Sequence, residues 1–163
     1  QTLLEVSREV QAEGWSFNRE FHYEMTPDTS KCIAIPSNML QIDATNNAAN
    51  AQLDVIRRSG KLYDKANHTY EFNNKVSCDI TWLFDWVDLP IPIQDYIISR
   101  ASKIASSRIV GDAGQYEMLA QKEGFARAMA MEYECNQGDY TFFGHSGDTN
   151  TYRSYQPYNA LYR

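Results

Sequence analysis

Cysteine, basic charge and long apolar runs are all scarce in this sequence of 163 residues. The three cysteines, Cys32, Cys78 and Cys135, share no C-x-x-C spacing and leave an odd thiol, so neither a disulfide framework nor a zinc site is predicted. This usage is typical of a protein assembled in a reducing cytoplasm. No stretch approaches the roughly 18 consecutive apolar residues of a membrane-spanning helix, so no such helix is predicted.

The deficit of basic charge limits how the protein can meet nucleic acid. Lysine and arginine total 15 residues against 21 aspartates and glutamates, which gives a formal net charge of −6. A protein that grips phosphates over a broad surface needs the opposite balance, so any contact with DNA should be loose. The sequence also lacks a G-x-x-x-x-G-K-[ST] motif, which argues against a nucleotide-hydrolysing packaging motor.

The sequence does contain a mixture of helical and strand patterns, and its length suits one domain. We predict that residues 1–143 form this domain and that residues 144–163 form an extended tail. A first helix is predicted over residues 1–13, because Leu3, Val6 and Val10 follow helical spacing and Gly14 is a natural stop. The helix starts without a capping residue, which is typical of a chain that begins partway through a larger helical segment.

Residues 20–84 have the texture of a β-rich region, with short apolar runs broken by turn residues. The two runs around residues 65–68 are predicted to form a hairpin, because the tip is polar and both flanks alternate apolar with polar residues. An antiparallel meander is the natural product of such consecutive short strands. The predicted strands are residues 21–25, 32–35, 53–56, 61–64, 69–72 and 76–80.

Two further helices are predicted over residues 93–110 and 115–136, and we expect them to pair as a hairpin. Pro92 can open the first of them, since its missing N–H costs nothing in a first turn. The second carries a broad apolar stripe suited to packing in a bundle. The stripe consists of Met118, Leu119, Phe125, Ala126, Met129, Ala130 and Tyr133. Together these patterns predict an α+β protein.

The C-terminal segment is rich in aromatic residues that follow neither helix nor strand periodicity. It is too aromatic for an ordinary solvated linker, yet it cannot build a core of its own. Aromatic residues are enriched where proteins meet, so we interpret the segment as docking on neighbouring subunits, with folding back over its own domain as the alternative. The interface candidates here are Tyr140, Phe142, Phe143, Tyr152, Tyr155, Tyr158 and Tyr162.

Two other pairs of residues stand out near predicted strands. Arg57 and Arg58 are the only adjacent arginines. They are candidates for an ion pair between subunits, and a solvated strand end is the plainer alternative. Trp15 and Phe17 follow the stop of the first helix, where large apolar side chains most simply anchor a core.

Carboxylates are the first candidates for chemistry, because hydrolysis of a polysaccharide needs two of them about 5 to 9.5 Å apart. Asp79, Asp85 and Asp88 lie close in sequence, and the last two flank Trp86 in an arrangement reminiscent of a sugar site. A strand that ends in a loop explains the same pattern, and we prefer that interpretation.

The remaining polar candidates predict no catalytic, metal or cofactor site. His22, His68 and His145 have no second histidine or cysteine at ligand spacing. Ser146 lies between Gly144 and Gly147, but the G-x-S-x-G pattern of a nucleophile elbow is broken and no strand leads into it.

Several separate pieces of the sequence, taken in order, resemble the tail tubular protein A family of short-tailed, podovirus-type bacteriophages. Gly14-Trp15-Ser16-Phe17-Asn18 is similar to the family's Gly-Trp-x-Phe-Asn element, and residues 35–43 are similar to its Leu-Pro-x-Asn-x-Leu-x-Ile-Asp segment. The other matching pieces are Thr26-Pro27-Asp28, Leu62-Tyr63-Asp64, His68-Thr69, Leu89-Pro90 and Met131-Glu132-Tyr133-Glu134. The resemblance covers roughly residues 1–143, although family members usually carry an additional N-terminal helix.

This resemblance implies a helix bundle with an inserted antiparallel β-rich region between the first helix and a C-terminal helical hairpin. It further implies a structural virion protein, a head-tail connector of twelve copies in a ring. The expected partners are the portal protein above and a tail nozzle of the tail tubular protein B type below, with tail fibres as a further candidate. DNA would pass through the lumen during ejection without specific binding, and no enzyme activity or cofactor is implied.

Two rival functions follow from the same residues. A virion-associated polysaccharide or peptidoglycan hydrolase would use Asp85 and Asp88. A monomeric binding module would have its aromatic tail folded back over its own domain.

Overall fold

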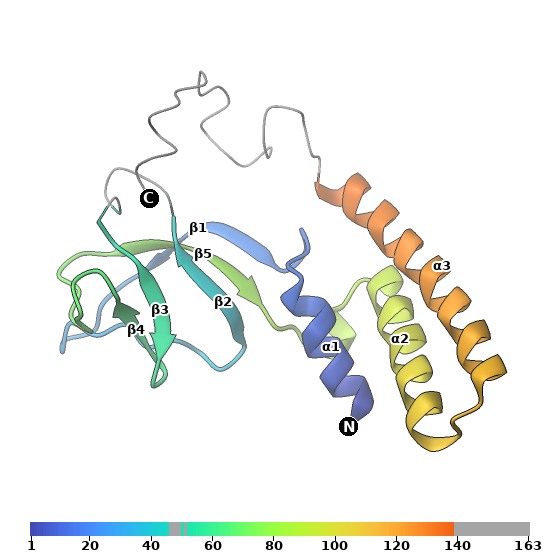
Figure 1. Cartoon of the computed structure of the whole chain (residues 1–163). Helices are drawn as coiled ribbons and strands as arrows, with labels where there is room; N and C mark the ends of the chain where they lie inside the picture. Colours follow the sequence, from blue (N-terminus) through green and yellow to red (C-terminus); the bar gives the residue numbers. More distant parts are fainter. Residues whose placement is uncertain (46–49, 51, 139–163) are drawn as a thin grey trace, which may run out of the picture.

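The computed structural model (Figure 1) describes residues 1–45, 50 and 52–138 of the chain. The predicted α+β organisation is confirmed, since a β-rich region stands between a first helix and a C-terminal helical hairpin. The predicted tail, with the aromatic candidates from Tyr140 onward, lies outside the described residues. The elements are α1 (Thr2–Ala12), β1 (Arg19–Met25), β2 (Met39–Ala44), β3 (Val55–Arg58), β4 (Lys61–Asp64), β5 (Val76–Trp82), the 3-10 turn η1 (Trp86–Asp88), α2 (Ile91–Ile109) and α3 (Ala113–Gly138).

The three helices form where their apolar spacing predicts them. Pro92 lies in the first turn of α2, and Gly111 ends that helix with a φ of 68°, a left-handed conformation that glycine adopts without strain. The chain then reverses into α3, which packs along α2 as the predicted hairpin, while α1 packs on α2 (Figure 1). Both helices of the hairpin start two residues earlier than predicted, which is the usual uncertainty at helix ends.

The sheet topology corrects the predicted meander. Strands pair in the order β1-β5-β2, so the first strand meets the last one and not its neighbour in sequence, and β3 and β4 form a separate hairpin. All these pairings are antiparallel. Residues on both faces of β5 are buried or half-buried, which makes it suited to the centre of a sheet and explains why it attracts two partners.

Two of the predicted strands are wrong. Residues 32–35 contribute only an isolated bridge between Ala34 and Lys61, and residues 69–72 only one between Thr69 and Asp64. The predicted hairpin around residues 65–68 is therefore a tight turn. It is held by the buried Asp64 carboxylate, which accepts hydrogen bonds from the Ala66 N–H and the Asn67 side chain. The actual partner of β4 is β3, and the strand β2 was not predicted at all.

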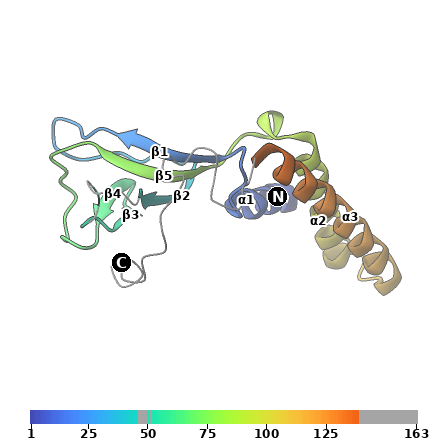
Figure 2. The same cartoon turned by 90° about the horizontal axis from the view of Figure 1, so that it is seen from above.

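The β-rich region and the helices each have their own core, and they lie side by side when seen from above (Figure 2). The β core contains Met25, Ile33, Ile35, Met39, Val55, Leu62, Phe72, Val76, Cys78 and Ile80. The helical core contains Val6, Val10, Trp15, Leu89, Ile93, Tyr96, Ile97, Ala101 and Ala130. The apolar residues of the two wrong strands are thus buried as expected, although without forming a ladder.

Two buried amide side chains clamp the two regions together. Asn18 donates to the carbonyls of Gln11 and Trp82, at 2.8 Å each, and accepts from the Trp15 N–H at 2.8 Å. The Gln11 side chain both accepts from the Phe84 N–H and donates to the Phe84 carbonyl. The end of α1 is therefore fixed to the segment that leaves β5, because every one of these polar groups depends on its partner for a hydrogen bond.

Candidate functional site

The two arginines proposed from the sequence do not form one basic patch. Both are exposed on β3, where successive side chains point to opposite faces of the sheet. Arg57 donates to the Met39 carbonyl at 3.2 Å, while the Arg58 guanidinium lies 4.2 Å from the centre of the Tyr63 ring. Both retain free donors at the surface, because a guanidinium has five N–H groups.

The three candidate carboxylates are not gathered into a site. The Asp79 carboxylate accepts a hydrogen bond from the Thr45 hydroxyl at 2.6 Å and another from the His22 N–H at 3.1 Å. Asp85 and Asp88 are exposed at the two ends of η1, where the Asp88 N–H donates to the Asp85 carbonyl. The preferred interpretation of a strand that ends in a loop fits this geometry.

Of the histidines that can be placed, His22 lies at the irregularity of strand β1 and His68 in the turn after β4. His22 and His68 are exposed and have positive φ angles of 59° and 53°. His145 and Ser146 lie outside the described residues. Within the described part of the chain, no group of three or more His, Cys, Asp or Glu side chains is arranged to hold a metal ion. No helix in that part is long and apolar enough to cross a membrane.

The predicted core anchor is confirmed. Trp15 is buried in the helical core, where its indole N–H donates to the Val10 carbonyl at 2.7 Å and its ring meets Tyr96 edge-on. Phe17 packs beside Phe84, with ring centres 6.2 Å apart. Both residues therefore serve the fold, with Trp15 buried and Phe17 half-buried against the helical core.

The thiols differ sharply in environment. Burial raises the pKa of the Cys78 thiol to about 12, and the nearby charges of Asp79 and Asp43 add to the effect. Cys78 therefore stays protonated and unreactive in the folded protein. Cys135 is exposed on α3.

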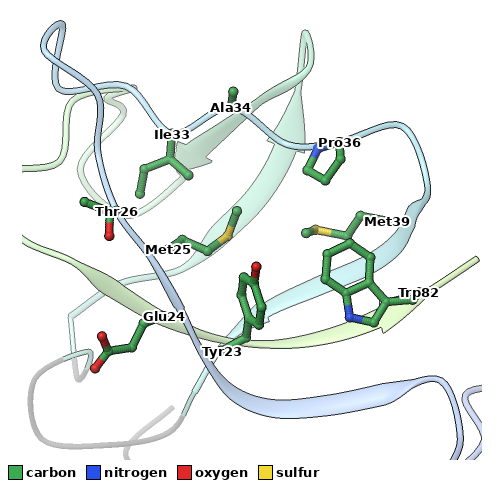
Figure 3. A pocket seen from close by; sticks show the side chains of 9 residues that line it. All are labelled: Tyr23, Glu24, Met25, Thr26, Ile33, Ala34, Pro36, Met39 and Trp82. Carbon is green, nitrogen blue, oxygen red and sulfur yellow. The ribbon is translucent and has the colours of Figure 1, made fainter.

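A shallow hollow of about 220 Å³ opens beside β1, at the edge of the three-stranded sheet (Figure 3). Its lining is mostly apolar and includes Tyr23 and Trp82, whose rings meet edge-on at 5.7 Å. Glu24 at the rim is paired with Lys75 at 3.1 Å. One exposed carboxylate in an apolar hollow suits contact with another surface better than it suits acid–base chemistry, which needs two positioned groups.

Among the described residues, most of the large exposed apolar side chains lie on the helices. The predicted stripe of α3 is only half buried in the subunit: Ala130 is buried and Ala126 half-buried, but Met118, Phe125 and Met129 are 67%, 77% and 58% exposed. This corrects the expectation that the whole stripe packs in the bundle. Several large exposed apolar side chains on one helix are typical of a surface that contacts another protein. On α2, Ile91, Ile98 and Ile109 are likewise 72%, 43% and 82% exposed.

Sequence reasoning missed the α2 surface and the amide clamp. The signal for the first is an apolar spacing of seven residues from Ile91 to Ile98, on a different side of the helix from Ile93 and Ile97. The signal for the amide clamp is Gln11, which lies on the buried face of α1 together with Ser7, Val6 and Val10. A glutamine on the buried face of a helix must find a hydrogen-bonding partner.

The comparison with protein families gives one match. A family model described as tail tubular protein matches residues 1–140. A search of curated proteins finds no match.

Proposed function

Since this chain belongs to the tail tubular protein family and is a structural component of a phage tail, we propose that it is the adaptor of a short-tailed phage. It forms a head-tail connector ring of twelve copies, with the portal protein on one side and the tail nozzle on the other. The observation that carries this proposal is the apolar surface of α2 and α3, which the described part of the subunit leaves uncovered. An isolated monomer rarely exposes so many large apolar side chains on one pair of helices.

The charge of the chain suits a conduit for DNA. With a net charge of −6, the protein offers few counter-charges to phosphate, so a ring of such subunits would let DNA pass during ejection without holding it. Arg57 and Arg58 are proposed to contact neighbouring subunits through their free donors. The aromatic residues from Tyr140 to Tyr162 are proposed to dock on neighbours in the assembled tail, with tail fibres as further candidates.

We propose no catalytic role and no cofactor. The family is one of structural virion components and not of enzymes. The geometry favours neither rival function. Asp85 and Asp88, which the hydrolase would use, are exposed at the two ends of η1, and the described parts of α2 and α3 expose several large apolar side chains, which a self-contained module would normally cover.

Electron microscopy of the purified chain mixed with its phage's portal tests the proposal. We expect rings stacked on the portal, coaxial with its channel. A chain that stays monomeric and ignores the portal at all concentrations would contradict the adaptor function.

Removing the aromatic tail tests its assigned role separately. Deletion of residues 144–163 should leave the thermal midpoint of the isolated subunit unchanged but weaken assembly, because a segment without helix or strand periodicity is expected to contribute little to the subunit's core. A loss of subunit stability as large as the loss of assembly would show instead that the tail folds back on its own domain.

A further inference from the structure

Helix α2 has three sides, and the described residues of the subunit cover only two of them. One side faces α1, where Arg100 pairs with Glu9 at 3.2 Å and Arg108 with Glu5 at 3.3 Å. A second side faces α3, where Lys103 pairs with Glu123. The third side is a stripe that is exposed except for the half-buried Ala105, and its alternating spacing of four and three residues is that of a helix–helix packing seam. The stripe consists of Ile91, Asp95, Ile98, Ser102, Ala105 and Ile109.

Helix α3 carries a second exposed stripe with the same kind of spacing. Met118, Lys122, Phe125 and Met129 lie on the side of α3 away from Ala126 and Ala130, which pack on the helical core. Beside Phe125 the surface is hollowed at Gly124 and Ala128. A Cβ added to Gly124 would meet no atom of the chain within 4 Å, so nothing inside the subunit requires glycine at this position. Glycine is unfavourable in the middle of a helix, and a close approach by another chain would explain why this position has a glycine.

We propose that the α2 stripe of one copy packs against the α3 stripe of the next copy, as the contact that closes the ring. This inference rests on the proposed ring, because a ring needs two different patches that meet head to tail. The two stripes are such patches, on different helices of one subunit. Their occupant is therefore a second copy of this chain.

The ring geometry and the charges together set the register of this contact. α2 and α3 run antiparallel within a subunit, and neighbours in a ring of twelve differ by a rotation of only about 30°, so α2 of one copy runs antiparallel to α3 of the next. When the two helices are set antiparallel with Asp95 beside Lys122, the span 91–98 lies along the equally long span 125–118. The inner spacings are four then three residues on α2 and three then four on α3, so the outer pairs are offset by one residue, about 1.5 Å along the axis. Ile91 then lies beside Phe125, and Ile98 beside Met118.

Asp95 and Lys122 are available for this contact. Both side chains belong to exposed residues, and none of the ion pairs formed among the described residues involves either of them. Each charge has large apolar side chains on both sides within its stripe. A charge pair in such a place fixes the register of two helices and disfavours other partners.

Charge reversal in the full chain tests the contact. We expect Asp95→Lys and Lys122→Asp each to weaken self-association at least about tenfold, because each places like charges together in the seam. The double variant, with the pair exchanged, should recover to within a few-fold of the parent. Glu71→Lys, a reversal at an exposed residue of the β-rich region, is the matched control and should behave as the parent.

Sedimentation of each variant, alone and with the portal, separates the possible results. A double variant no better than the weaker single variant, or single variants indistinguishable from the parent while the parent forms rings, would overturn this contact and leave the adaptor function standing. Rescue by the double variant, with no binding of the portal by any of them, would support the contact and contradict the adaptor function. A parent that neither self-associates nor assembles on the portal would overturn both.

Discussion

The β-rich region and the helical bundle have cores of similar size but very different surfaces. Around the β core, the large apolar residues that reach the surface, Phe21 and Tyr23, are less than half exposed. Around the helical core, Ile91, Phe125 and Ile109 are each more than 70% exposed. The β-rich region is therefore nearly complete within one subunit, whereas the bundle is not. We infer that the helices make the main contacts between subunits of the assembly and that the β-rich region contributes few of them.

Helix α2 itself has a buried side and an exposed side. Substitutions on these two sides should give the largest expected difference in the free energy of unfolding. Tyr96→Ala should destabilise the subunit by about 3–5 kcal/mol, because it removes a fully buried ring that packs on Trp15 and accepts a hydrogen bond from Arg100. Ile98→Ala, on the exposed side of α2, should cost less than about 1 kcal/mol. Urea denaturation of the dilute subunit measures both. Equal losses would mean that the outer side of α2 is already packed.

The junction between the regions should show the next largest effect. Asn18→Ala removes the hydrogen bonds of Asn18 with the Trp15 N–H and with the carbonyls of Gln11 and Trp82, which should cost about 1–3 kcal/mol. The exposed Asn73→Ala is the control and should be neutral. Thermal unfolding followed by near-ultraviolet circular dichroism reports on both aromatic cores. If Asn18→Ala leaves the midpoint unchanged, the clamp does not couple the two regions.

Replacing each of two glycines by alanine should change the stability of the subunit in opposite directions, by a smaller amount. Gly124→Ala should stabilise the isolated subunit by up to about 1 kcal/mol, since the helix gains propensity and the new Cβ has open space. Gly111→Ala should destabilise it by about 1 kcal/mol, because its φ of 68° disfavours a side chain. Chemical denaturation decides between these signs. A destabilised Gly124→Ala subunit would show that α3 needs the glycine for its own folding.

Labelling of the cysteines tests the packing of the β core with the smallest expected effect, since the label leaves the fold intact. The pKa of about 12 keeps the Cys78 thiol protonated at pH 8, and its burial in the β core keeps reagents away. Under native conditions we expect a thiol reagent to modify the exposed Cys135 but to reach Cys78 only after unfolding. Mass spectrometry of the labelled peptides measures this. Rapid native labelling of Cys78 would mean that the β core opens easily.

The sequence predicted the helices well because each helix is a local pattern. Apolar spacing and the glycines at positions 14 and 111 were enough to place α1, α2 and α3. Strand β4 was predicted at its observed bounds for the same reason. The partners of β1 and β2 could not be predicted, because both depend on β5, which lies far along the chain. The run around Tyr70 alternates like a strand, but the Asp64 side chain closes a turn before it.

The candidate site was harder to predict from the sequence than the helices, because a pattern of apolar residues does not indicate whether they are covered by the same chain or by another one. Met118 and Ala126 belong to one broad stripe in the sequence. Only the structure separates the side that packs on the subunit's own core, with Ala126, from the exposed side, with Met118. The pair Arg57 and Arg58 looked like one feature, but strand alternation divides it. The prediction that the aromatic residues after Gly138 make contacts between subunits stays a prediction.

The most direct test of the adaptor function is the native mass of the full chain alone and after mixing with its phage's portal. We predict a discrete complex that contains one portal assembly and a full ring of this chain, with twelve copies as the expected number. A mass equal to the portal alone beside free monomers, at concentrations well above those in an infected cell, would contradict the account.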